Sequence, residues 1–391
     1  MKTLLLRSGL VVAILLAALA IASRERIAQL LAVNSLFDPD TIVENTVSMP
    51  ELFHSTELSR GTGPVSPLTV GPPLDLPPGY ADWVRDRSVT AIVVLKDGQL
   101  VHEGYHLGTD ASDRRISWSV AKSYLSTLIG TAVDAGEIAS IDEPVTAYVP
   151  SLSGTAYNGA RIRHVLNMSS GVVFNEDYFD FWSDINRMGR VLALGRSMDR
   201  FAEGLGETFA PPGQQFRYVS IDTHVLGMVL RGATGQSVPE LLEARIIEPL
   251  GLEQDGAYIT DGYGVAFVLG GLNFTTRDYA RFGQMVQNGG TWQGRRIVSA
   301  AWLREATRAS AATAPGDLHY GYQWWMPADE DVSRADHAFM GLGVYGQHLY
   351  IDPEAGVVIA TNGADRGFQE DGVLERNVEM FRALTAAATG P

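Results

Sequence analysis

The placement of the strand-like segments constrains the fold of this chain more than any other feature of its sequence. Residues 91–106 read AIVVLKDGQLVHEGYH, in which two β-branched or apolar runs flank Asp97-Gly98, a pair typical of a tight hairpin. Residues 347–363 read QHLYIDPEAGVVIATNG, which predicts strand, turn and strand. Strands at both chain ends do not favour a doubly wound parallel sheet. They predict an α+β fold, with an antiparallel sheet formed by both chain ends, flanking helices and a mainly helical region.

The helical segments lie between and after these hairpins. Residues 119–135 read SVAKSYLSTLIGTAVDA, with apolar residues at helical spacing, and Gly136 follows as a typical C-terminal stop. Residues 140–310 contain several short amphipathic segments that end in glycine, such as RIRHVLNMSSG and TRDYARFGQMVQNGG. Residues 374–387 also have a helical pattern. A hydrophobic content of 46% over 391 residues is ample for a large core.

The N-terminus has the pattern of an export signal. Lys2 and Arg7 precede an apolar run over residues 9–22, which is as long as a signal-peptide h-region and short for a membrane span. We therefore expect residues 1–23 to be a signal peptide or an N-terminal membrane anchor. The body of the protein is expected to be exported, to the periplasm or the extracellular space, and the anchor would tether it to the membrane.

Two further ranges complete the expected domain organisation. Residues 24–85 include GTGPVSPLTVGPPLDLPPG, and proline and glycine at this density predict an N-terminal extension and linker. Residues 86–391 are expected to form the folded domain.

The net charge of -15 and the lack of a long Lys/Arg stripe argue against nucleic-acid binding. The sequence contains no cysteine, which excludes disulfides, thiolate metal sites and a cysteine nucleophile.

The segment HEGYH at residues 102–106 fits the H-E-x-x-H pattern of zinc proteases. That chemistry needs a helix, so that both histidines lie on one face. Here the segment continues a hairpin strand, where residues four apart are separated by roughly 13 Å. The motif therefore indicates a solvated strand rather than a zinc site.

The segment GLGVYG at residues 341–346 fits G-x-G-x-x-G. A dinucleotide site needs a strand before it and a helix after it, but these glycines run into the strand-like segment HLYID. Glycine in such a place is typical of a close approach between the backbone and a ligand.

The segment SVAK fits S-x-x-K, with Ser119 and Lys122 at the start of the helix expected over residues 119–135. A chain of this length contains roughly one such tetrapeptide by chance. At a helix start, however, residues i and i+3 share one face, so that the lysine can reach the serine hydroxyl. The alternative is an N-cap serine beside a solvated lysine.

Several longer phrases resemble one family. Besides SVAK they are PPGQQFRYVSIDTHVLG, which contains Tyr218-Val219-Ser220, and RIRHVLNMSSG, DYARFGQMVQNGGTWQGRRIV and LYIDPEAGVVIATNG. They are similar to the β-lactamase-related serine hydrolases: class C β-lactamases, DD-peptidases, family VIII-type esterases and 6-aminohexanoate-dimer hydrolases. The resemblance extends from about residue 91 to the C-terminus.

This chain departs from the family at one motif. β-Lactamases and DD-peptidases carry Lys-Thr-Gly on the strand that edges the active site, whereas this chain has HAFMGLGVYGQ. The substitution argues against both activities, and the Gly-x-x-Gly-Gln form is similar to 6-aminohexanoate-dimer hydrolases and some esterases. The segment NEDY, which ends at Tyr178, resembles a segment that supplies a tyrosine to the substrate, with a core tyrosine as the alternative.

The resemblance implies a serine hydrolase that cleaves an ester or amide bond of a small molecule through an acyl-enzyme. It implies Ser119, Lys122 and Tyr218 as the catalytic group, with the proton position left open between the lysine and the tyrosine. The backbone N–H groups of Ser119 and Val344 would form the oxyanion hole. Substrate-binding residues would be Tyr178, Ser220, Gly343 and Tyr345. No metal or organic cofactor is required. The alternatives are a β-lactamase or DD-peptidase, and a catalytically inactive ligand-binding relative.

Overall fold

The computed structural model describes residues 24 and 27–390. The expected signal peptide or anchor over residues 1–23 lies outside this part of the chain. In the described part, we find no helix that is both long and apolar enough to cross a membrane.

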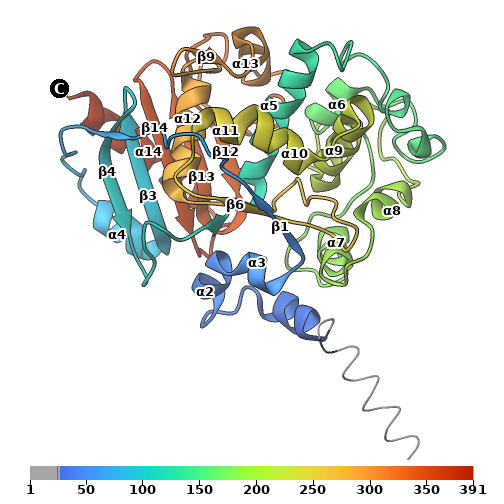
Figure 1. The fold of residues 1–391 in the computed structure, drawn as a ribbon, viewed down its shortest axis with the longest axis horizontal. Helices are drawn as coiled ribbons and strands as arrows, with labels where there is room; N and C mark the ends of the chain where they lie inside the picture. The colour runs from blue at the N-terminus through green and yellow to red at the C-terminus, as the bar shows by residue number, and fades with distance from the viewer. Residues whose placement is uncertain (1–23, 25–26, 391) are drawn as a thin grey trace, which may run out of the picture.

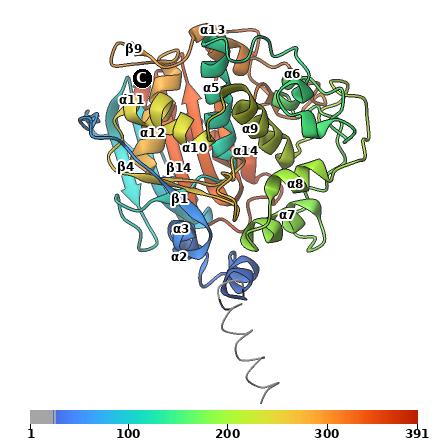
Figure 2. The same ribbon diagram turned by 45° about the vertical axis from the view of Figure 1, so that its right-hand side comes forward.

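The main sheet joins the two ends of the chain, as the hairpins predicted. The central contact is an antiparallel pairing of β14 with β3, and every neighbouring pair in this sheet is antiparallel except β2 with β4. Figures 1 and 2 show the sheet on one side of the molecule and most of the helices on the other. In spatial order its strands are β10 (His319–Tyr320), β11 (Trp325–Met326), β12 (Phe339–Gly343), β13 (Gln347–Asp352), β14 (Val357–Gly363), β3 (Val89–Lys96), β4 (Gln99–Tyr105) and β2 (Thr69–Val70).

Helices cover both faces of this sheet, which explains why β3 is apolar at nearly every position. Ile92 and Val94 belong to a core with α4 (Tyr80–Asp86) and α14 (Val373–Thr389). Val93 and Leu95 belong to the main core with α5 (Ala121–Asp134) and α12 (Thr276–Gln287). The helices predicted over residues 119–135 and 374–387 are therefore confirmed.

The helical region packs around α5. Its principal partner is α9 (Ser220–Thr234), whose own neighbours are α6 (Ile162–Leu166) and α8 (Met198–Glu203). The other numbered α-helices are α2 (Ile42–Val47), α3 (Met49–Leu52), α7 (Asp184–Ala193), α10 (Val238–Leu242), α11 (Glu248–Leu250) and α13 (Ala300–Ala306). The short helical turns are η1 (Trp118–Val120), η2 (Val145–Ala147), η3 (Pro150–Leu152), η4 (Glu243–Ile247) and η5 (Val344–Gly346).

A second, smaller sheet was not predicted from the sequence. It has four strands in the order β1 (Ser55–Leu58), β6 (Gly256–Ile259), β7 (Leu272–Phe274) and β5 (Arg115–Ile116). A separate pair, β8 (Thr291–Trp292) with β9 (Arg295–Arg296), lies after α12. Each of these strands has only two to four residues, so the sequence has no run long enough to reveal an alternating pattern.

Residues 24–85, expected as an extension and linker, make specific contacts with the rest of the chain. Strand β1 pairs with β6, and β2 pairs with β4. Residues 27–35 are helical, and together with α2 and α3 they lie below the junction of the sheet and the helical region in Figure 1. The stretch over residues 59–68 between these strands is irregular and mostly exposed.

Close packing of α5 against α13 depends on Gly130. A Cβ atom built on Gly130 would lie 2.3 Å from Cδ1 of Trp302. We therefore expect Gly130→Ala to lower the free energy of unfolding by about 1–3 kcal/mol, because overpacking outweighs the gain in helix propensity. Urea unfolding would measure this. As a control, Gly189→Ala in α7 meets no atom within 4 Å and should instead be neutral or raise stability by up to ~1 kcal/mol. Equal stability changes in the two variants would contradict the packing argument.

Candidate active site

Ser119 lies in η1, the tight turn that leads from β5 into α5. The preceding residue, Trp118, has a φ of 39°, which non-glycine residues adopt only when the surroundings enforce it. The turn contacts β12 and β13 at the end of the main sheet. Ser119 is partly exposed at this junction, so the turn presents its hydroxyl to the site while α5 anchors it.

Lys122 follows Ser119 by three residues and points to it, as the S-x-x-K spacing predicted. Its Nζ donates hydrogen bonds to Oγ of Ser119 at 2.9 Å, to the carbonyl oxygen of Leu269 at 2.9 Å and to Oγ of Ser220 at 3.3 Å. The side chain is 2% exposed. Burial lowers the pKa of Lys122 to about 7, against a smaller opposing effect of the Glu176 carboxylate. A large fraction of this lysine is therefore an uncharged amine at neutral pH.

Tyr218 completes the predicted group just before α9. Nζ of Lys122 lies 5.2 Å from the centroid of its ring. The ring also packs against Trp325, with centroids 5.3 Å apart. Burial first, and then the negative charge of Glu176, raise the pKa of Tyr218 well above its usual value, while hydrogen bonds with Ser119 and Ser220 oppose this rise. The phenol thus stays protonated when the lysine is neutral.

Glu176 is a site residue that the sequence analysis missed. Its carboxylate accepts hydrogen bonds from the Ser220 hydroxyl, from the Ser220 backbone N–H at 3.0 Å and from the Tyr178 hydroxyl at 2.8 Å. It therefore ties the loop after residue 171 to the first turn of α9. The segment NEDY was singled out for Tyr178, and the acidic residue two positions earlier was the available signal.

The glycine-rich segment lies beside Ser119. It forms the end of β12 and η5, and β13 follows, so the strand continuation predicted for GLGVYG is confirmed. A Cβ atom built on Gly343 would lie 2.8 Å from the carbonyl oxygen of Ser117 and 3.1 Å from the backbone nitrogen of Ser119. Only glycine allows this approach. It brings Val344, the second residue expected in the oxyanion hole, to the wall of the same site.

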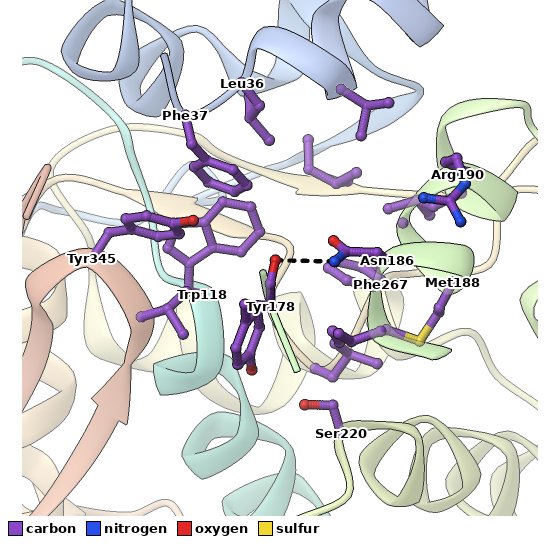
Figure 3. Close-up of a pocket in the computed structure, with 18 of the residues that line it drawn as sticks. Leu36, Phe37, Trp118, Tyr178, Asn186, Met188, Arg190, Ser220, Phe267 and Tyr345 are labelled. Atoms are coloured by element: carbon purple, nitrogen blue, oxygen red, sulfur yellow. Dashed lines mark hydrogen bonds between the residues drawn. The ribbon is translucent and has the colours of Figure 1, made fainter. Parts of the chain in front are cut away.

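Two cavities meet at Ser119, and each is large enough for part of a small molecule. The first has a volume of about 300 Å³ and is lined by Trp118, Ser220, Tyr345 and residues of the N-terminal extension. The second has a volume of about 390 Å³, and its lining includes Tyr218, Glu176, Gly343 and His348. Tyr178 and Val344 line both. The structure thus brings every predicted site residue to one place. Figure 3 shows three of them, Tyr178, Ser220 and Tyr345, around the first cavity.

The zinc-protease pattern has a structural role. His102 lies on β4, where its Nε2 is 2.8 Å from the hydroxyl of Tyr80, and Glu103 binds Arg277 through both carboxylate oxygens. Among residues 24 and 27–390 no cluster of acidic, histidine or cysteine side chains has an arrangement suited to a metal ion. The strand interpretation of HEGYH is confirmed.

Comparisons with known proteins identify the family of this chain. The beta-lactamase family model matches residues 83–378. The 6-aminohexanoate-dimer hydrolase of Paenarthrobacter ureafaciens is 30% identical over 296 residues, which cover 72% of this chain and 74% of that protein. Penicillin-binding protein 4 of Amycolatopsis lactamdurans is 28% identical over 319 residues, which cover 70% of this chain and 80% of that protein.

Solved structures show the same fold. A candidate 6-aminohexanoate-dimer hydrolase from Bacillus anthracis has a TM-score of 0.79 at 24% identity, covering 90% of this chain and 95% of that chain. EstCE1, a hydrolase with promiscuous acyltransferase activity, has a TM-score of 0.61 at 16% identity, covering 79% of this chain and 98% of that chain. The family model and the 30% identical relative show that the chain belongs to the beta-lactamase family, and that it is a hydrolase of the amidase and esterase type.

Proposed function

We propose that this hydrolase cleaves an ester or amide bond through an acyl-enzyme on Ser119. The observation that carries the proposal is the contact between a buried lysine and the serine hydroxyl, at 2.9 Å, in a place where burial lowers the pKa of Lys122 to about 7. An unassisted serine hydroxyl is a weak nucleophile and needs a base within hydrogen-bond reach. The uncharged amine of Lys122 meets that need.

The residues support a balanced two-step reaction. Lys122 takes the proton of the Ser119 hydroxyl as Oγ bonds to the carbonyl carbon, and the backbone N–H groups of Ser119 and Val344 stabilise the resulting oxyanion. The carbonyl re-forms as the bond to the leaving group breaks, and Tyr218 protonates that group and regains a proton from Lys122. Water then attacks the acyl carbon and gives one proton to the same pair. As the bond between the acyl carbon and Oγ breaks, the pair returns that proton to Oγ, which releases the acid and the free serine.

A second candidate is hydrolysis of β-lactams, which the similarity to a penicillin-binding protein supports. The strand that edges the site argues against it, because β12 has the sequence FMGLG and no Lys-Thr-Gly. The matched relative named as a 6-aminohexanoate-dimer hydrolase favours a linear amide or an ester instead.

The direct test compares the wild-type chain with Ser119→Ala. We expect the wild type to react with a fluorophosphonate probe and to hydrolyse p-nitrophenyl acetate or a linear 6-aminohexanoate dimer. Ser119→Ala should lower the rate at least about a thousandfold. Ser126→Ala is the matched control, since Ser126 is a buried serine of α5, the helix that follows Ser119, and its hydroxyl has no partner among the described residues. A folded wild type that neither labels nor turns over any substrate would refute the proposal, and faster turnover of nitrocefin would favour the second candidate.

The pH dependence tests the role of Lys122. The base must be uncharged, so kcat/KM should rise as pH increases through about 7, the pKa of this lysine. The charge of Glu176 raises that pKa, so Glu176→Gln should move the rising limb to lower pH. Asp177→Asn, which removes an exposed charge from the next residue, should leave the limb in place. Equal profiles for the wild type and Glu176→Gln would exclude Lys122 as the titrating base.

The close approach at Gly343 tests the oxyanion hole. Gly343→Ala places a methyl group against the backbone of Ser117 and Ser119, and we expect a loss on the order of 100-fold in kcat, the cost of one misplaced oxyanion donor. Gly341→Ala on the same strand meets first the Ser123 hydroxyl at 3.2 Å and should lose much less. Steady-state kinetics with a p-nitrophenyl ester would measure both, and equal losses would contradict the assignment.

A further inference from the structure

The two cavities at Ser119 differ in the groups that line them. Tyr218, which the proposed mechanism uses to protonate the leaving group, lines the second cavity and is absent from the lining of the first. Glu176 likewise lines the second cavity and not the first. An ester or amide has its acyl chain and its leaving group on opposite sides of the carbonyl carbon. The leaving group therefore belongs to the second cavity, and the acyl chain extends into the first.

The wall of the first cavity is mainly apolar, and much of it comes from the N-terminal extension. Leu36, Phe37, Met49 and Phe53 line it from the extension, opposite Met188 of α7 and Phe267. Figure 3 shows Leu36 and Phe37 above Trp118 and Tyr345, with Met188 and Phe267 across the space. None of the four extension residues lies within residues 83–378, the part that matches the family.

Aromatic stacking fixes the extension on the site. The ring of Phe37 stacks on Tyr345 with centroids 4.2 Å apart and an interplanar angle of 14°, and it lies 5.7 Å from Trp118. Trp118 directly precedes the nucleophile, and Tyr345 directly follows the second expected oxyanion residue. Phe37, and with it this wall of the cavity, is thus held by the same backbone segments that hold the reacting atoms.

The lining of the first cavity includes one charged side chain, that of Arg190. The guanidinium of Arg190 sits over the ring of Phe181 at 4.2 Å. Phe181 belongs to a loop with three exposed aromatic side chains, since Phe179 is 70%, Phe181 51% and Trp182 75% exposed. Exposed aromatic residues grouped at the mouth of a cavity are typical of sites that take apolar ligands.

We infer that the first cavity is an acyl pocket, and that the substrates are esters or amides of apolar acids from hexanoyl to decanoyl length. The inference rests on the proposed function, because it uses Ser119 and Tyr218 to assign the two cavities. A volume of about 300 Å³ has room for a chain on the order of ten carbons, at the ~30 Å³ per group of a water-sized liquid. An acetyl group would leave nearly all of this apolar wall without a partner.

The first experiment is a chain-length series on the full-length protein, with p-nitrophenyl acetate, butyrate, hexanoate, octanoate and decanoate. Each methylene that enters an apolar pocket is expected to raise kcat/KM by up to about fourfold. We therefore expect kcat/KM for octanoate to exceed that for acetate by more than about 100-fold. A flat or falling series, with acetate still hydrolysed in a Ser119-dependent way, would overturn the acyl pocket and leave the proposed function intact.

A pair of substitutions at Leu36 tests whether the extension forms the wall. Leu36→Trp fills part of the cavity and should move the preferred ester toward butyrate. The ratio of kcat/KM for octanoate to kcat/KM for acetate should fall about tenfold or more. Leu36→Ala widens it and should move the preference toward decanoate. Leu31→Trp and Leu31→Ala are matched controls, because Leu31 lies in the same extension, is 64% exposed and does not line the cavity. An unchanged profile in both Leu36 variants, with melting temperatures like the wild type, would refute the assignment.

Binding measured without turnover separates this inference from the proposed function. We expect Ser119→Ala to bind octanoic acid more tightly than butyric acid in calorimetry, with a negative heat-capacity change from apolar burial. If no ester is hydrolysed by the wild type, the proposed function fails, and octanoic acid binding still decides whether the cavity accepts an apolar chain. Equal affinity for the two acids would refute the acyl pocket.

Discussion

The amine of Lys122 is the group around which the rest of the site is arranged. An ammonium ion withdrawn from water is costly, and this chain compensates with three oxygens, from Ser119 in η1, Ser220 at the start of α9 and Leu269 before β7. Each oxygen comes from a different part of the chain. The lysine can keep its position and its lowered pKa only while those parts stay packed, so the chemistry of the site depends on the cooperativity of the whole core.

Much of the fold could be predicted from the sequence because its signals are local. The turn at Asp97-Gly98 and the apolar runs on both sides identified the β3–β4 hairpin, and the spacing of residues 119–135 identified α5. The smaller sheet could not be predicted in this way. Its strands β1 and β6 have four residues each and are separated by about two hundred positions, so their pairing is decided by tertiary packing and not by a pattern in either segment.

The site residues likewise divide into those that the sequence could predict and those that it could not. Ser119 and Lys122 could be recognised because a helix brings residues three apart to one face, and Tyr218 and Val344 were recognised through longer phrases shared with a family. Glu176 could not be assigned, since a carboxylate in a loop has no periodicity and its partners lie on α9. The extension residues were missed for the same reason: no pattern in residues 33–53 indicates that they line a cavity together with Ser119.

The pairing of β1 with β6 has a consequence for solubility. Strand β6 has the sequence GAYI, all four of its residues are buried, and β1 covers the side that β7 leaves open. Without residues 55–58, the backbone N–H and C=O groups of an apolar strand would form an unprotected edge, a template on which other chains can add strands. A protein trimmed to the matched family region, residues 83–378, would keep every proposed catalytic residue and still tend to aggregate. The N-terminal extension thus protects the molecule against edge-to-edge association.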